Sequence, residues 1–186
     1  MHVQKGLTLT ELVCVLALIS ILTGFVMPSL TAIRERNAAT TSINWIISAV
    51  NFTRHAAINH SITMTLCPTL DGKRCGGKWH DGLMVFADHN KDARINGSDF
   101  LLHRINADNV YGTLKWRSFR NRQYLQMTPF GYTNFQNGNF VYCPMDNNPD
   151  YARQIVISVP GRARVAHYRS EKGERVDRKG KPLRCD

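Results

Sequence analysis

The stretch from Leu12 to Ile33 contains no charged side chain and constrains the fold of this chain more than any other feature. Its first part reads LVCVLALISILTGFVM, in which only one serine, one threonine and one glycine interrupt the apolar residues. A helix needs roughly 20 mainly apolar residues to cross a bilayer. A helix with so few polar side chains also lacks the polar face that a core helix of a soluble protein turns toward water. We therefore expect residues 7–33 to span a membrane.

The same stretch differs from a removable secretory signal. Its apolar run is longer than the roughly 7–15 residues of such a signal, and Pro28 and Ser29 behind it make a poor cleavage site. A polar leader, residues 1–6, precedes it. Glu11 lies at the edge of the run, where a carboxylate is costly unless it finds a partner, so it is a candidate functional residue. The alternative is a carboxylate that lies in the lipid headgroup region.

Residues 5–12, Lys-Gly-Leu-Thr-Leu-Thr-Glu-Leu, resemble the processing site of type IV prepilins. The resemblance implies that a prepilin peptidase cuts after Gly6 and methylates the new N-terminal residue, Leu7, where the family usually has phenylalanine. It also implies that Glu11 pairs with the N-terminal amine of a neighbouring pilin subunit during assembly. The subunit is then expected first as a single-pass protein of the inner membrane, and afterwards in a pilus that crosses the periplasm to the cell surface.

An amphipathic helical pattern continues from residue 34 to about residue 60. The apolar residues Ala39, Ile43, Ile46, Val50 and Ala57 are four, three, four and seven positions apart, so they share one face of a helix. We expect this part to extend the membrane segment as one long helix and to pack on a folded domain.

Short β-like runs separated by turn residues occupy residues 61–186. The candidate strands are 62–67, 83–87, 100–105, 112–116, 124–128, 139–143, 154–159 and 163–168. Together with the resemblance to pilins, this order predicts an α+β protein with the type IV pilin fold. A long N-terminal helix, membrane-spanning in its first half, packs on a C-terminal antiparallel β-sheet domain that ends in a basic tail.

Four of the five cysteines lie in the β region, and Cys14 lies in the apolar stretch. If the β region is exported, their even number suggests two disulfides, for which three connectivities exist. We favour Cys67–Cys75 across a short glycine-containing loop and Cys143–Cys185, which would fasten the tail to a strand. A zinc site is the competing interpretation, but the chain has no C-x-x-C pair. We expect neither a metal nor another cofactor.

The segment from Asp88 to Asp99 has oxygen-bearing side chains at the spacing of a calcium loop. A true EF-hand loop has glycine sixth and glutamate twelfth, where this chain has Ala93 and Asp99. We prefer a loop in which Asp and Asn side chains hydrogen-bond to the local backbone, and leave calcium open.

The C-terminal part resembles one branch of the pilins, the GspH/FimT-like minor pilins and pseudopilins. The matching segments are 81–90, 129–131, 138–143 and 155–164. The resemblance implies a low-abundance filament subunit of type IV pili or of type II secretion. Some FimT-type members are implicated in DNA uptake through a Gly-Arg-x-Arg motif, which Gly161, Arg162 and Arg164 match here.

The chemistry of this motif suits a DNA backbone. On the strand that follows the Pro160-Gly161 turn, Arg162 and Arg164 share one face while Ala163 points inward. Two arginines about 7 Å apart match the spacing of successive phosphates, and Gly161 would let the backbone come close. Residues 160–186 contain nine basic and four acidic residues. The other candidate DNA contacts in them are Arg169, Lys172, Arg175, Arg178, Lys179 and Lys181.

A second basic cluster, residues 115–122, interleaves cations with aromatic side chains. We expect Trp116 in the core and the arginines on an exposed face. Whether these arginines add to the DNA contact stays open.

Three functions compete. The first is a minor pilin that binds extracellular double-stranded DNA without sequence preference, for DNA uptake in natural transformation, and the formal charge of +10 favours it. The second is a type II secretion pseudopilin, or a priming or structural minor pilin, that binds no DNA. The third is a membrane-anchored enzyme, but the sequence has no G-x-S-x-G, no H-E-x-x-H and no phosphate loop. We therefore expect that the protein is not an enzyme.

Overall fold

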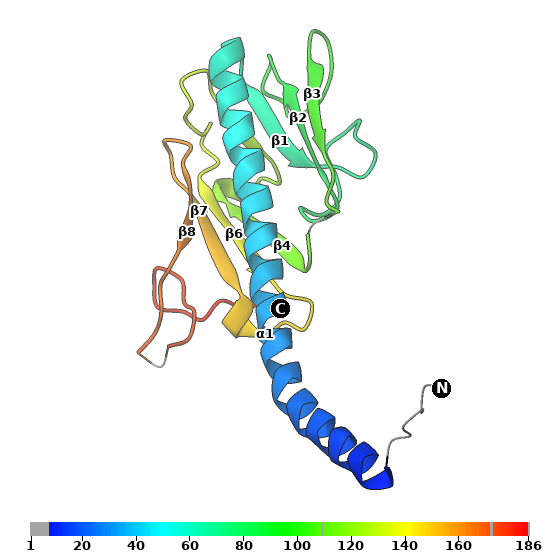
Figure 1. The fold of residues 1–186 in the computed structure, drawn as a ribbon. Coiled ribbons are helices and arrows are strands. Elements are labelled where there is room, and N and C mark those ends of the chain that lie inside the picture. Colours follow the sequence, from blue (N-terminus) through cyan, green and yellow to red (C-terminus); the bar gives the residue numbers. More distant parts are fainter. Residues whose placement is uncertain (1–7, 109, 172, 186) are drawn as a thin grey trace, which may run out of the picture. The chain divides into compact units, whose positions relative to one another are not determined.

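The computed structural model describes residues 8–108, 110–171 and 173–185 of the chain (Figure 1). They form one long helix, α1 (Leu9–His60), eight strands and two short 3-10 turns. The predicted leader, residues 1–6, and the processing residue Leu7 lie outside the described residues, and so does Lys172.

The chain divides inside α1 into two units, residues 1–37 and 38–186, and each is described by itself. In the first unit, Thr8 precedes the helix and its Oγ1 accepts a hydrogen bond of 3.3 Å from the main-chain N–H of Glu11. The hydroxyls of Ser20 and Thr23 donate to main-chain carbonyls four residues earlier, over 2.8 and 2.9 Å. These two hydroxyls are therefore satisfied within the helix itself.

The large apolar side chains of this first unit are exposed wherever the structure describes them. They are Leu9, Leu12, Val13, Val15, Leu16, Leu18, Ile19, Ile21, Leu22, Leu30 and Ile33. Among the described residues, however, no helix has both the length and the apolar character needed to cross a membrane. The membrane-spanning segment predicted over residues 7–33 is not confirmed.

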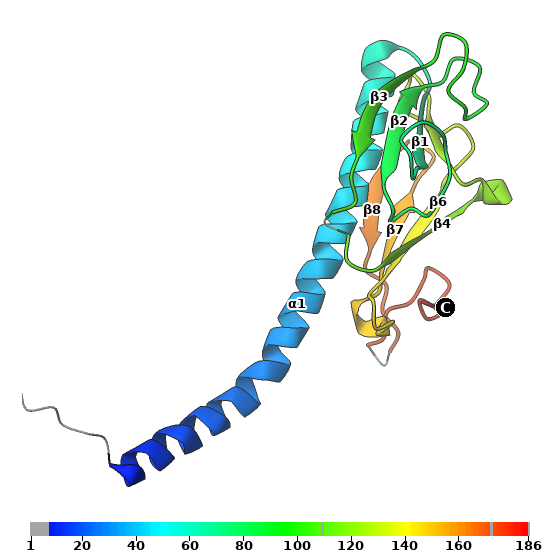
Figure 2. The same ribbon diagram turned by 90° about the vertical axis from the view of Figure 1, so that its right-hand side faces the viewer.

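In the second unit, residues 38–60 of α1 bury the face that the sequence predicted. The five residues Ala39, Ile43, Ile46, Val50 and Ala57 are all buried. Four polar residues that lie away from this face are exposed: Thr41, Asn44, Ser48 and Asn51. Both sheets lie on the same side of this part of the helix (Figure 2).

The eight strands form two antiparallel sheets of four, and each strand overlaps one of the predicted segments. The first sheet has the order β3 (Phe100–Ile105), β2 (Leu83–Ala87), β1 (Met64–Pro68), β5 (Leu125–Met127). The second has the order β4 (Thr113–Ser118), β6 (Gly138–Cys143), β7 (Arg153–Ile157), β8 (Ala163–Ala166). The 3-10 turns are η1 (Phe119–Asn121), after β4, and η2 (Pro149–Tyr151), before β7.

The core lies between α1 and the inner faces of the two sheets. In the second sheet every other residue points into it, because side chains alternate along a strand. Trp116 is 4% exposed and its ring centroid lies 4.3 Å from that of Phe140, which in turn lies 4.8 Å from the ring of Trp79. The predicted core position of Trp116 is confirmed.

Both disulfides that we favoured are present. Cys67–Cys75 closes the loop behind β1, and Cys143–Cys185 joins the end of the tail to the end of β6. The four cysteines are therefore not available as zinc ligands, and Cys14 is not disulfide-bonded.

The two disulfides should differ in their contribution to stability. They join residues 8 and 42 positions apart. In the chain-entropy account, Cys143→Ala/Cys185→Ala should then lower the free energy of unfolding by about 4 kcal/mol and Cys67→Ala/Cys75→Ala by about 2.5 kcal/mol. The measurement is denaturant unfolding of the oxidised full chain in a nonionic detergent, followed by the signal of the buried tryptophans. Equal losses would contradict the entropic explanation.

Candidate nucleic-acid interface

The outer face of the second sheet, on the side away from α1, carries a row of side chains that crosses all four strands. Directly paired residues of an antiparallel sheet point to the same face. The pairing gives the row Arg117 on β4, Asn139 on β6, Val156 on β7 and Arg164 on β8. The outer face thus has an arginine at each of its two edges.

The β7–β8 hairpin presents Arg162 and Arg164 as predicted. The main-chain N–H of Ser158 donates to the carbonyl of Arg162 over 3.1 Å and closes the turn. Both arginines are exposed, whereas Ala163 and Val165 between and behind them are partly buried and pack on the core. Arg164 lies on β8, which is an edge strand, and Arg162 directly precedes it, so both side chains lie at one edge of the sheet.

Gly161 has a structural role that the sequence analysis did not predict. Its φ is +71°, and it is buried. A Cβ at this position would collide with the carbonyl oxygen of Gly131 and lie 3.2 Å from the Arg54 side chain. The glycine therefore lets the hairpin turn pack on the loop before β6. Because it faces the protein, its position serves this packing and not the close approach of DNA that we predicted.

The tail is folded in the part that the structure describes, despite its polar composition. The main-chain N–H of Ser170 donates to the carbonyl of Glu174 over 2.9 Å, and that of Asp177 to the carbonyl of Lys181 over 2.8 Å. Val176 and Leu183 are 5% and 8% exposed, so each anchors the tail by burying an apolar side chain. Four predicted DNA contacts of the tail region are exposed: Arg169, Arg178, Lys179 and Lys181.

Arg175 differs from these four cations because it is partly buried. Its Nε donates to the main-chain carbonyl of Asp150 over 3.1 Å. Burial, and after it the nearby charge of Arg169, lowers the pKa of the Arg175 guanidinium. Arg175 therefore helps to hold the tail against the β6–β7 connection, and its contact with DNA stays a prediction.

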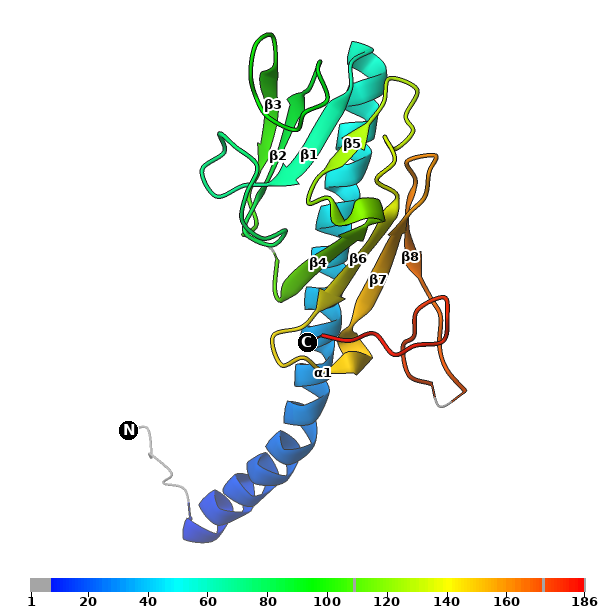
Figure 3. The same cartoon turned by 180° about the vertical axis from the view of Figure 1, so that it is seen from behind.

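A cavity of about 550 Å³ lies between the tail and the outer face of the second sheet. Figure 3 shows the tail, in red, passing over β7 and ending beside β6. The sheet contributes Arg117, Asn139, Val141 and Gln154 to the lining, and the tail contributes Asp177, Lys181, Pro182, Leu183 and Arg184. Three cations and one carboxylate therefore surround the cavity. The candidate set from the sequence lacked Arg184, although its place next to a bridged cysteine was a usable signal.

The cluster at residues 115–122 has divided roles. The Nζ of Lys115 donates to the carbonyl of Cys185 over 3.2 Å and so fastens the end of the tail. Arg117 shares the cavity with the tail cations, as described above. Arg120 and Arg122 lie over the rings of Phe119 and Tyr124, with 5.5 and 5.7 Å between the guanidinium carbon and the ring centroid.

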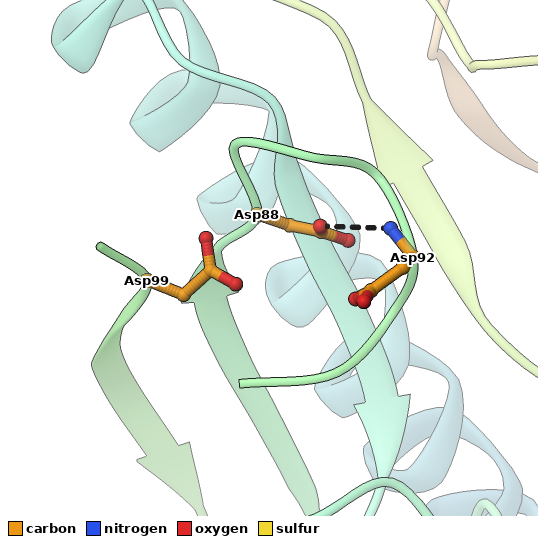
Figure 4. A group of neighbouring side chains, drawn as sticks. All are labelled: Asp88, Asp92 and Asp99. Atoms are coloured by element: carbon orange, nitrogen blue, oxygen red, sulfur yellow. Dashed lines mark hydrogen bonds between the residues drawn. The ribbon is translucent and has the colours of Figure 1, made fainter. Parts of the chain in front are cut away.

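The acidic loop behind β2 brings three carboxylates together (Figure 4). Oxygens of Asp88, Asp92 and Asp99 lie within 4.8 Å of one another. Asp88 is fully buried, and its carboxylate accepts bonds from the main-chain N–H groups of Asp92 and Ala93, over 3.1 and 3.0 Å. A hydrogen bond from the Asn96 side chain is the main cause that lowers the pKa of Asp92. These local bonds are the arrangement that we preferred over a calcium loop.

Comparison with known proteins assigns the chain to a family. Residues 42–161 match the family described as type II transport protein GspH, and residues 1–27 match the prokaryotic N-terminal methylation motif. The chain belongs to the GspH family. No curated protein sequence matches it.

Two solved structures resemble it, both of the type IV minor pilin FimU from Pseudomonas aeruginosa strain PAO1. One has 16% sequence identity and a TM-score of 0.55 and covers 71% of this chain and 90% of FimU. The structure in the other crystal form has 15% sequence identity and a TM-score of 0.50, and it covers 68% of this chain and 91% of FimU. At these identities they show the fold, which is the predicted type IV pilin fold.

The family and the methylation motif make the chain a type IV pilin-like protein of the GspH/FimT family, which supports a minor pilin or pseudopilin role in assembly with other pilin subunits at the membrane. The GspH match ends at Gly161, so Arg162, Arg164 and the tail lie beyond it. Their function has to be argued from their own chemistry.

Replacing Gly161 by alanine tests its structural role. Gly161→Ala should lower the free energy of unfolding by about 2–4 kcal/mol, because an L-residue at this φ is strained and the new methyl group meets the Gly131 carbonyl. Gly180 has a similar φ of +75° but nothing within 4 Å of an added Cβ. Gly180→Ala is the matched control and should cost only about 1 kcal/mol in denaturant unfolding. Equal costs would show that the contact with Gly131 is unimportant.

Proposed function

We propose that this protein is a minor type IV pilin that binds DNA without sequence preference through the outer face of its second sheet. The observation that carries the proposal is the exposed pair Arg162 and Arg164 on an edge strand, with Arg117 in the same cross-strand row. Extracellular DNA is the expected substrate and uptake for natural transformation the expected process, as for FimT-type members of the family.

The charge distribution supports a polyanionic ligand. The chain has no Asp or Glu between Asp108 and Asp146, or between Asp150 and Glu171. All four strands of the second sheet lie in these two segments, so the cations of this sheet have no carboxylate within their own strands to neutralise them. A surface of this kind attracts phosphate backbones at long range.

The spacing of the cations suits contacts to phosphates. Residues two apart on a strand are roughly 7 Å apart, close to the distance between successive phosphates of one DNA strand. Arg117 and Arg164 are three strand positions apart, which is roughly 14 Å. The tail cations Lys181 and Arg184 border the same face from the other side of the cavity. Lys172 is retained as a candidate from the sequence.

The binding is expected to depend on charge and not on the base sequence. Arg162, Arg164 and the tail cations have long side chains on an open face, and such contacts to phosphates fix position without reading bases. Affinity should therefore be similar for unrelated duplexes and should fall steeply as the salt concentration rises.

The N-terminal part is expected to act as in other pilins. In this proposal a prepilin peptidase cuts between Gly6 and Leu7 in the inner membrane, and Glu11 pairs with the N-terminal amine of a neighbouring subunit. The alternative is a type II secretion pseudopilin, or a priming minor pilin, that uses the same N-terminal chemistry and binds no DNA. The charge of the second sheet favours the first function over the second.

Substitution of the two hairpin arginines tests DNA binding. Arg162→Gln and Arg164→Gln should each weaken binding of unrelated duplexes by about 1.5 kcal/mol, or roughly tenfold, and lower the salt slope by about one. The measurement is a salt titration of the full chain in a nonionic detergent by fluorescence anisotropy. Arg74→Gln is the matched control, because the side chain of Arg74 is 87% exposed and lies in a loop of the first sheet. Unchanged affinity in both hairpin variants would reject this site.

A further inference from the structure

We propose that the end of the second sheet, where η1 and the loop before β6 meet, is a stacking site for unpaired bases, so that the protein prefers single-stranded over double-stranded DNA. This inference rests on the proposed DNA-binding function and specifies which form of DNA the interface takes. Its central residues are Phe119, Arg120 and Phe135.

Both the exposure and the backbone conformation of Phe135 are unfavourable. Its side chain is 79% exposed, although phenylalanine gains free energy by burial. Its φ is +62°, the left-handed region that a bulky L-residue rarely occupies. A residue that is both strained and exposed to water in this way is typical of a binding site.

A buried polar network holds Phe135 in place. The residues on either side, Asn134 and Gln136, both bond to Gln126, with side-chain contacts of 3.0 and 3.3 Å to its Oε1. The main-chain N–H of Asn134 also donates to the Gln126 carbonyl over 3.0 Å. Gln126 is fully buried, and its Nε2 donates to Asp88 over 2.8 Å. The loop is therefore fixed on both sides of the phenyl ring, which points to a preorganised contact.

The neighbouring turn η1 adds a second ring and a cation. Phe119 is 58% exposed, and its main-chain N–H donates to the carbonyl of Asn137 over 3.2 Å. This bond places η1 beside the loop that carries Phe135. Arg120 also has a left-handed φ, +61°, and its guanidinium lies over the Phe119 ring. Two exposed rings and an arginine thus occur on two adjoining, fixed segments.

The stacking site lies at the same end of the second sheet as the arginine hairpin. The pairing of β6 with β7 begins at Gly138 and Ile157, so Asn137 and Ser158 lie at the end where Ser158 bonds to Arg162. Across three strand spacings, the distance from η1 to the start of β8 is roughly 14 Å. A single strand that stacks on the rings would reach the hairpin arginines with its next few phosphates.

Unpaired bases are the occupant that this chemistry favours. Bases stack on exposed aromatic side chains when their faces are free, and arginine adds attraction to both base and phosphate. In a duplex the base faces are covered by their neighbours in the stack. The segment 109–145, which carries both rings, contains four cations and no carboxylate. This charge favours a nucleic acid as the ligand over a protein surface that is basic or has few acidic residues.

The test compares a 20-nucleotide oligothymidylate with a duplex of the same length on the full chain in a nonionic detergent. Single strands should bind more tightly. Phe135→Ala and Phe119→Ala should each weaken single-strand binding about 5- to 150-fold and leave duplex binding unchanged. Phe135→Tyr, which keeps the ring, should bind like the original chain, whereas Phe135→Leu should not. Phe100→Ala is the matched control, since Phe100 is also exposed, at 42%, but lies on β3 of the first sheet.

Four results would overturn the proposal. Equal binding of both forms, unaffected by the phenylalanine variants, would remove the stacking site and leave the duplex-binding function standing. If only the hairpin arginine variants weaken binding, and they weaken it for both forms of DNA, the stacking site is likewise removed and the duplex-binding function stands. If neither form binds at low salt, the proposed function fails together with this inference. Should Phe135→Ala impair filament assembly alone, the rings belong to a contact between subunits.

Discussion

The burial of one face of α1 against both sheets is the constraint on which the rest of the second unit depends. Ile43, Ile46 and Val50 are buried in the core that α1 shares with the inner faces of the sheets. Every second residue of β4, β6 and β7 must therefore be apolar and point inward. The residues between them are left to the outer face, where chemistry is free to vary without cost to the core.

The outer face of the second sheet carries cations, and the strand pairing determines which of them lie close together. Arg117 and Arg164 are 47 positions apart in the chain, yet they lie in one row because β6 and β7 separate their strands by a fixed register. The tail adds Lys181 and Arg184 to this face, where the Cys143–Cys185 bond and the buried side chains of Val176 and Leu183 hold it. Basic residues from three distant segments thus meet through backbone pairing and one covalent link.

The sequence predicts the local features well, because they depend on nearby residues. The helix face from Ala39 to Ala57 and the alternation at Arg162 and Arg164 follow from periodicity alone, and all eight strands were found within a few residues. It does not predict features that depend on register between distant strands. The split into two sheets, the contact of Gly161 with Gly131 and the cavity beneath the tail belong to this second kind. Phe135 was missed because nothing in its neighbours signals a left-handed backbone.

The positive charges of the basic face destabilise the free protein, because like charges on one face repel one another, which disfavours the compact state. Two disulfides, a buried polar network at Asp88 and a buried apolar core offset this repulsion. Binding of a polyanion to such a surface would relieve the repulsion and release counterions at the same time.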